Sequence, residues 1–252
     1  TFQEVAAIHQ KAIKIGYTVN HDLVYGLPFQ TLDGFKNTIN KTIRLRPSRI
    51  ALYSYAHVPW IKGTGQRGYK DTDLPKDLEK RAIYEMAFSM LLEAGYISIG
   101  MDHFAKPTDE LVIAQKQGRL HRNFQGYSTH ADAVLVSCGV SAISAVGTSY
   151  SQNEKTLEAY YERLDNNELP VARGIKLSMD DLIRRAIIQT LMCHFELSIS
   201  SIELAYPITF NEYFVTELKT LRVLEEDGLV KIEEKWLCVT LKGRLLIRNI
   251  CM

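Results

Sequence analysis

Hydrophobic residues follow a helical period in some stretches of the chain and gather in short apolar runs in others. Residues 2–15 place an apolar side chain at every third or fourth position, which predicts an amphipathic helix. The run over 17–25 is rich in β-branched and aromatic residues and predicts a strand. A second helix is predicted from the N-cap candidate Thr31 to Pro47, followed by a second strand over 50–55.

The same alternation continues along the chain. A long helix is predicted from Pro75 to about Ala94, with Gly95 at its carboxyl end, and a third strand over 96–100. Helices and strands that alternate with short links are typical of a parallel α/β sheet or barrel. We therefore predict an α/β domain over residues 1–150.

Beyond residue 150 the pattern becomes mainly helical. The predicted elements are, in order, a helix over 155–164, a linker at 170–174, a helix opened by the capping box Ser178-x-x-Asp181, a helix over 210–226, a hairpin over 229–240 and a last helix from Lys242. Helix, helix, hairpin and helix is a winged-helix-like order. The remaining domain prediction is a helix and linker at 151–174 and a helical C-terminal domain at 175–252.

Composition narrows the class of protein. Of the 252 residues, 46% are hydrophobic and 23% are charged, as in ordinary globular proteins. A net charge of +1 argues against a nucleic-acid partner or an anionic membrane, and no apolar run approaches the roughly 18–20 residues that span a bilayer. Both ends lie inside apolar helical patterns, so we expect the natural chain to extend further in both directions.

The cysteines are widely spaced, at Cys138, Cys193, Cys238 and Cys251. No pair has C-x-x-C spacing, which argues against a zinc or iron–sulfur site built within these residues. Each cysteine lies among apolar residues. This pattern predicts buried free thiols in a reducing cytoplasm.

Candidate chemistry lies first at the predicted strand ends. Asp22 comes near the carboxyl end of the first strand, where α/β enzymes gather their sites. Its carboxylate can accept hydrogen bonds from ribose hydroxyls or an ammonium group, or it can serve only as a turn cap. The second strand leads to Ala56, between Tyr55 and His57, at the same edge.

Two strings are dense in Gly, His, aromatic and polar residues: Gly-Met-Asp102-His103-Phe-Ala and His-Arg122-Asn-Phe124-Gln125-Gly-Tyr. Such mixtures form poor helices and strands and are typical of loops that contact a ligand. Asp102 and His103 can form an acid–base pair or be held in a hydrogen-bond network. Phe124 offers a stacking face and Gln125 offers donors and acceptors, while Arg122 can meet a carboxylate or pair locally.

Two glycine-containing stretches have different interpretations. Residues 63–68 match G-x-G-x-x-G, but no strand directly precedes them and no helix opens on them, so we predict a loop rather than a dinucleotide site. Residues 134–146 include Ile143 and many small residues. That composition suits a strand or turn where the backbone approaches a ligand closely.

Taken together, the strings resemble the oxygen-independent coproporphyrinogen III oxidase family of radical S-adenosylmethionine (SAM) enzymes. They are Asp22-Leu-Val-Tyr-Gly-Leu-Pro28, Tyr55-Ala-His57, Gly100-Met-Asp-His-Phe-Ala105, His121-Arg-Asn-Phe-Gln-Gly-Tyr127, Gly139-Val-Ser-Ala-Ile-Ser144 and Lys242-Gly-Arg-Leu-Leu-Ile-Arg-Asn-Ile-Cys251. The resemblance implies the later part of a partial, TIM-like (β/α) radical SAM barrel, followed by a mostly helical, winged-helix-like C-terminal domain.

The resemblance also implies an activity and a set of site residues. Members of the family convert coproporphyrinogen III to protoporphyrinogen IX by oxidative decarboxylation, in porphyrin and haem biosynthesis. They use SAM, a [4Fe–4S] cluster and an electron donor whose identity the sequence does not give. By the same resemblance, Asp22, Ala56 and Ile143 match positions that contact SAM, and Phe124 and Gln125 match positions near a second SAM.

The chain departs from the family at one point. The cluster-binding C-x-x-x-C-x-x-C motif and the glycine-rich SAM motif do not occur in its residues. We therefore expect an active parent enzyme, and a chain that by itself assembles no cluster and is inert. Two other interpretations stay open: a haem-binding chaperone paralogue on the same scaffold, and a winged-helix regulator. Acidic residues near the hairpin, such as Glu225 and Glu233, disfavour DNA binding.

Overall fold

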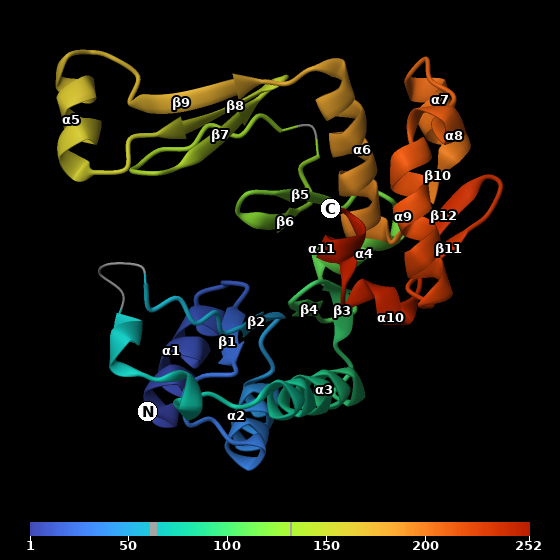
Figure 1. The fold of residues 1–252 in the computed structure, drawn as a ribbon. Helices are drawn as coiled ribbons and strands as arrows, with labels where there is room; N and C mark the ends of the chain where they lie inside the picture. Colours follow the sequence, from blue (N-terminus) through green and yellow to red (C-terminus); the bar gives the residue numbers. More distant parts are fainter. Residues whose placement is uncertain (61–64, 132) are drawn as a thin grey trace. The chain divides into compact units, whose positions relative to one another are not determined.

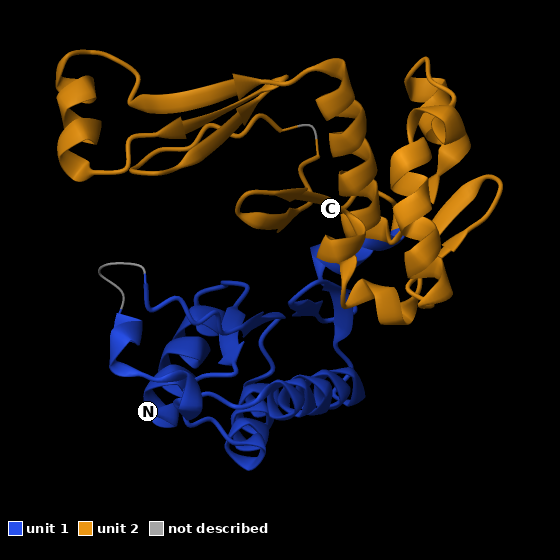
Figure 2. Ribbon diagram, in the orientation of Figure 1, with its two compact units in different colours: residues 1–116 blue, residues 117–252 orange. Residues whose placement is uncertain are grey.

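The computed structural model describes residues 1–60, 65–131 and 133–252. They form two compact units, an N-terminal unit of residues 1–116 and a C-terminal unit of residues 117–252 (Figure 2). No helix among the described residues is both long and apolar enough to cross a lipid bilayer. The units divide the chain at a different place from the predicted domains, whose boundaries at 150 and 174 stay a prediction.

The N-terminal unit alternates helices and strands, and the elements predicted for it are confirmed. The described elements of the unit are, in chain order, α1 (Phe2–Lys14), β1 (Asn20–Tyr25), α2 (Leu32–Leu45), β2 (Arg49–Ser54), two 3-10 turns (Gly65–Gly68 and Asp71–Asp73), α3 (Asp77–Glu93), β3 (Ile97–Gly100), β4 (His103–Ala105) and α4 (Glu110–Lys116). The side chain of Thr31 opens α2 by accepting a hydrogen bond from the N–H of Gly34 at 3.1 Å. Of the predicted loop at 63–68, the first two residues lie outside the described part of the chain.

The four strands form one sheet in the order β1-β2-β4-β3 (Figure 1). β1 and β2 are parallel, as predicted, but β4 runs antiparallel to both of its neighbours. The chain can fold back between β3 and β4 because Gly100 and Met101 adopt positive φ angles of 150° and 49°. A wholly parallel sheet, which the alternation of helices and strands predicts, is therefore wrong at β4.

One face of this sheet carries the core of the N-terminal unit. Ile50 of β2 and Phe104 of β4 pair across the strands and pack, fully buried, against Phe35 of α2 and Ile83 of α3. Since alternate residues of a strand point to opposite faces, the neighbouring side chains belong to the other face. We call that second surface the far face.

The C-terminal unit begins with short strands and ends in helices. Its elements are β5 (His121–Asn123), β6 (Gly126–Ser128), β7 (Ile143–Val146), β8 (Ser149–Asn153), α5 (Leu157–Asp165), β9 (Val171–Lys176), α6 (Met179–His194), β10 (Glu196–Ser198), α7 (Ile199–Ala205), α8 (Phe210–Tyr213), α9 (Val215–Glu226), β11 (Val230–Ile232), β12 (Trp236–Val239), α10 (Leu241–Arg244) and α11 (Ile247–Ile250). The capping box of Ser178 and Asp181 and the hairpin of β11 and β12 are confirmed.

Three predictions for this unit are corrected. Of the stretch predicted as a linker at 170–174, residues 171–174 are part of β9, which pairs with β8 in the three-stranded sheet β7-β8-β9. The helix predicted over 210–226 breaks at Phe214, and the last helix is two short turns. Residue 150 lies within β8, which pairs with β7 on one side and with β9 on the other.

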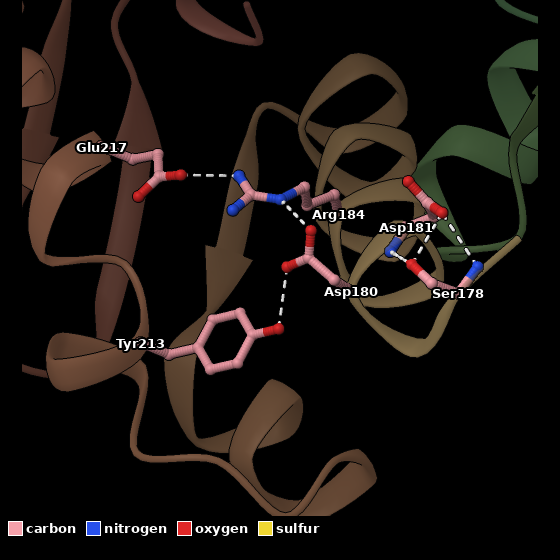
Figure 3. Close-up of polar contacts among 6 residues, drawn as sticks. All are labelled: Ser178, Asp180, Asp181, Arg184, Tyr213 and Glu217. Carbon is pink, nitrogen blue, oxygen red and sulfur yellow. Dashed lines mark hydrogen bonds and ion pairs between the residues drawn. The ribbon is translucent and has the colours of Figure 1, made fainter.

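An ion-pair network joins α6 to α8 and α9 (Figure 3). Arg184 contacts the carboxylate of Asp180 at 2.8 Å and that of Glu217 at 2.6 Å, while Tyr213 donates its hydroxyl to Asp180 at 2.8 Å. The hydrogen bond from Arg184 lowers the pKa of Asp180. Because these side chains are about 40% exposed, solvent screens each pair and its contribution to stability is small. Their contribution is to fix how the three helices pack.

Candidate functional site

The far face of the N-terminal sheet aligns an acid with a histidine. Asp22 of β1 pairs with Ala51 of β2, and Ala51 pairs with His103 of β4, so the three form one row across three strands. The small side chain of Ala51 separates the two polar groups. Tyr53, two residues along β2, lies on the same face with its ring 6.0 Å from that of His103, in an edge-to-face arrangement.

Asp22 is exposed and accepts a hydrogen bond from the side-chain amide of Asn20 at 2.7 Å. It stands third among the six residues of β1, and so lies further from the carboxyl end than the sequence suggests. A cavity of about 550 Å³ lies beside it, lined by residues of α1, β1 and α2 that include His21 and Lys41. The exposed carboxylate can therefore accept further hydrogen bonds from a polar ligand.

A histidine pair ties α1 to β1 next to Asp22. His9 is buried, and its Nδ1 lies 3.0 Å from Nε2 of His21. Burial is the main cause that lowers the pKa of His21; repulsion from His9 adds to it, and the charge of Asp22 opposes it. The folded chain therefore favours the neutral form of His21.

This pair makes stability depend on pH. The pKa of His21 in the folded chain lies below its unfolded value of about 6.5. The contribution of neutral His21 to the free energy of unfolding is therefore complete above pH 6.5 and is lost as the pH falls through the folded pKa. We expect the free energy of unfolding to drop between pH 7.5 and 5.5, and His21→Gln to reduce that drop. Urea unfolding at both pH values measures this drop in the free energy of unfolding, with a variant of an exposed histidine, His130→Gln, as control. A drop of the same size in His21→Gln and the unmodified chain would contradict this role.

Ala56 lies at the carboxyl edge of the same sheet, two residues beyond β2. Its carbonyl accepts a hydrogen bond from the amide of Gln66 at 3.1 Å, and Lys80 donates to the carbonyl of Tyr55 at 2.8 Å. Burial lowers the pKa of Lys80. Ala56 stands five residues past Ala51, the partner of Asp22, so the structure places these two predicted residues at separate points along the sheet.

In the C-terminal unit, Phe124 and Gln125 form the two-residue turn of the β5–β6 hairpin. The side chain of Asn123 fixes the turn by accepting the N–H groups of Gln125 at 2.9 Å and Gly126 at 3.2 Å. Phe124 is 58% exposed, and Gln125 is also exposed. This segment is therefore a tight hairpin that presents both side chains at its tip.

Helix α6 holds this hairpin. The side-chain amide of Gln189 donates to the carbonyl of Arg122, and Tyr127 donates its hydroxyl to the carbonyl of Met192 at 3.1 Å. The guanidinium of Arg122 lies 4.8 Å from the centre of the Tyr127 ring. One strand of the hairpin is thus anchored by Gln189 and the other by Tyr127, which positions Phe124 and Gln125 on a rigid element.

Ile143 shares a surface with Phe124 through Tyr150. Ile143 begins β7 and points to the same sheet face as Ala145, the residue that pairs with Tyr150 of β8. The ring of Tyr150 meets that of Phe124 edge to face at 5.3 Å. The structure therefore places Tyr150 against Phe124 and on the same sheet face as Ile143, a neighbour that the sequence analysis missed. The two-residue link Gly147-Thr148 between short runs was a hairpin signal that could have indicated it.

The cysteines do not form a cluster site. Cys138 is exposed, contrary to the sequence-based prediction, and Cys193 is buried. Burial raises the pKa of Cys193 to about 12 and that of Cys251 to about 11, so both stay protonated at neutral pH. Among the described residues, no group of three or more His, Cys, Asp or Glu side chains is arranged to hold a metal ion. The residues present do not fit a [4Fe–4S] cluster, which needs several thiolates together.

Comparison with known proteins shows which family the chain belongs to. A model of the HemN C-terminal domain matches residues 177–246. The oxygen-independent coproporphyrinogen III oxidase of Thermostichus vulcanus is 45% identical over 234 residues, which cover 92% of this chain and 72% of that protein. The chain belongs to the oxygen-independent coproporphyrinogen III oxidase family.

Two further relatives agree with this assignment. The family member from Escherichia coli (strain K12) is 47% identical over 249 residues, covering 98% of this chain and 54% of that protein. A solved structure described as coproporphyrinogen III oxidase (HemN) from Escherichia coli, a radical SAM enzyme, matches with a TM-score of 0.97 and 47% identity. The matched region covers all of this chain and 58% of the chain in that structure. The chain thus spans about half the length of most curated relatives it matches.

Proposed function

We propose that the protein containing this chain is an oxidoreductase of porphyrin and haem biosynthesis that converts coproporphyrinogen III to protoporphyrinogen IX without oxygen. The observation that carries the proposal is the 45% identity to a named coproporphyrinogen III oxidase of which this chain covers 72%. The match to a radical SAM enzyme over all 252 residues supports it. The reaction would decarboxylate two propionate side chains to vinyl groups.

Five residues are proposed as SAM contacts. An exposed carboxylate at Asp22 fits a polar group of SAM, such as a ribose hydroxyl or the ammonium group. The small Ala56 fits a close approach at the strand end, and Ile143 offers an apolar contact. Phe124 and Gln125, at the tip of a hairpin that α6 anchors, suit a second SAM. When bound with its cluster, SAM would supply the radical that abstracts a substrate hydrogen.

We also propose a type of fold for each part of the chain. The strands β1 and β2 with α1, α2 and α3 suit the later part of a partial, TIM-like radical SAM barrel. The helices α6, α7 and α9 with the sheet β10-β12-β11 suit a winged-helix-like domain. We further propose a cytoplasmic location, an electron donor whose identity is open, and neither nucleic acid nor membrane as partner.

Anaerobic assay of the full-length protein tests the activity. With a reconstituted cluster, SAM, a chemical reductant and coproporphyrinogen III, we expect protoporphyrin fluorescence after oxidation of the product, together with 5′-deoxyadenosine. The 252-residue chain under the same conditions should give neither, because its cysteines cannot ligate a cluster. Haem uptake by the full-length protein without decarboxylation would favour a chaperone, and salt-dependent DNA binding would favour a regulator.

A further inference from the structure

One face of the sheet β7-β8-β9 has an apolar and aromatic centre with arginines beside it. Its pairing register places Ala145, Tyr150 and Ile175 in one row, and Ile143, Gln152 and Arg173 in the next. We call this surface, together with Phe124 and Arg185, the arginine face. Figure 1 shows the sheet extending from α6 on the same side as the β5–β6 hairpin.

The centre of the arginine face suits an apolar ring system. Tyr150 is half-buried, with Phe124 against its edge at 5.3 Å, and Phe124 itself is 58% exposed. Ile175, the neighbour of Tyr150 on β9, is 59% exposed. Exposed apolar side chains that are grouped around an aromatic pair indicate a contact surface, whereas single exposed apolar side chains are common on any protein.

Both arginines of this face lack a carboxylate partner among the described residues. Arg173 donates from Nε at 2.9 Å and from Nη2 at 2.6 Å to the side-chain oxygen of Gln152, a neutral group. Arg185 lies 5.9 Å from the centre of the Tyr150 ring and donates to the carbonyl of Gly147 at 3.4 Å. By contrast, Arg163 and Arg184 of the same unit each contact two carboxylates.

The chemistry of these side chains defines the ligand. A guanidinium carries five N–H donors, so Arg173 and Arg185 both keep donors for a carboxylate. The register rows of the arginine face contain no acidic residue that would compete. We propose that this face binds the tetrapyrrole substrate, with the pyrrole rings against Tyr150 and Ile175 and propionate carboxylates at Arg173 and Arg185.

This inference rests on the proposed function, because it takes its ligand from that reaction. It goes further in naming residues that hold the propionate groups. The positive sulfonium and ammonium groups of SAM gain nothing from two cationic neighbours, whereas a substrate with four carboxylates does. Arg173 and Arg185 are therefore specificity residues for the substrate, distinct from those assigned to SAM.

A binding assay on the 252-residue chain tests the inference without any cluster. The probe is coproporphyrin III, the fluorescent oxidised form of the substrate, with mesoporphyrin, which has the same ring and only two carboxylates, as the matched ligand. Loss of one charge-assisted contact weakens binding about 10- to 150-fold. We expect Arg185→Gln and Arg173→Gln each to raise the Kd of coproporphyrin by this factor and that of mesoporphyrin by less. Arg222→Gln, which removes an exposed ion pair with Glu225, should leave both unchanged.

The outcomes separate this inference from the proposed function. Unchanged coproporphyrin binding in both arginine variants would overturn it, even in an active enzyme. So would a full-length Arg185→Gln enzyme with a raised KM for SAM and an unchanged KM for coproporphyrinogen, because the face would then belong to SAM. If the full-length protein binds coproporphyrin through these arginines but does not decarboxylate its substrate, the proposed function fails and the binding face stands.

Discussion

Replacing Gly243 with alanine is expected to destabilise the C-terminal unit by about 3 kcal/mol or more. A Cβ atom at this position would lie 2.0 Å from the carbonyl oxygen of Leu229, 2.9 Å from its carbonyl carbon and 3.0 Å from Val239. The carbonyl belongs to the backbone and accepts hydrogen bonds from both the N–H and the hydroxyl of Thr240. Relief of the clash would pull α10 away from Leu229 and break those bonds.

Urea unfolding of the unmodified chain and the Gly243→Ala variant measures the effect. Gly68→Ala makes the same chemical change where, apart from the adjacent residues of the chain, no heavy atom of the described residues lies within 4 Å of the new methyl group. The free energy of unfolding of this variant should therefore stay within about 0.5 kcal/mol of the unmodified value. A Gly243→Ala chain as stable as the Gly68→Ala control would show that α10 can move away from Leu229 at little cost.

The case of Gly243 shows what the sequence could and could not predict. The string Lys242-Gly-Arg carries part of the family resemblance, but only packing of α10 against Leu229 explains the glycine. Elements set by local patterns were predicted well: the capping box of Ser178 and Asp181 and the N-cap at Thr31 both depend on residues close in the chain.

Elements that depend on distant pairing were missed. Ala172 and Gly174 have low strand propensity, so local sequence gives little sign of the strand β9, and pairing with β8 is what holds it extended. The turn at Met101 that makes β4 antiparallel has no local sequence signature, since a non-glycine residue rarely adopts positive φ.

The residues of the candidate site also fall into two groups, those that the sequence indicated and those that only the structure shows. Resemblance to a family supplied Asp22, Ala56, Phe124, Gln125 and Ile143, and their roles stay predictions. The structure adds what lies around them: Ala51 between Asp22 and His103, and Tyr150 between Phe124 and Arg185. Such neighbours come from register across strands and from aromatic contacts. Neither is visible in a single sequence.

The largest effect on activity is expected from Asp22→Asn in the full-length enzyme. If the exposed carboxylate of Asp22 accepts hydrogen bonds from SAM, its loss removes a charge-assisted contact of about 1.5–3 kcal/mol. That corresponds to a rise of roughly 10- to 150-fold in the KM for SAM. Asn keeps the size of the side chain and can still pair with Asn20, so the fold should be unaffected. Initial rates at varied SAM concentration, with coproporphyrinogen III saturating, measure the effect.

A matched variant separates this role from a general effect of charge. Asp33→Asn removes an exposed carboxylate from the first turn of α2, at a position with no proposed SAM contact, so the KM for SAM should stay unchanged within about twofold. The contact of this carboxylate with the helix dipole contributes only a few tenths of a kcal/mol, so the stability of the fold should also be nearly unchanged. If Asp22→Asn binds SAM as tightly as the unmodified enzyme and keeps its melting temperature, Asp22 is not a SAM ligand. The row of Asp22, Ala51 and His103 would then be a feature of strand packing alone, since register across β1, β2 and β4 fixes it whatever the carboxylate binds.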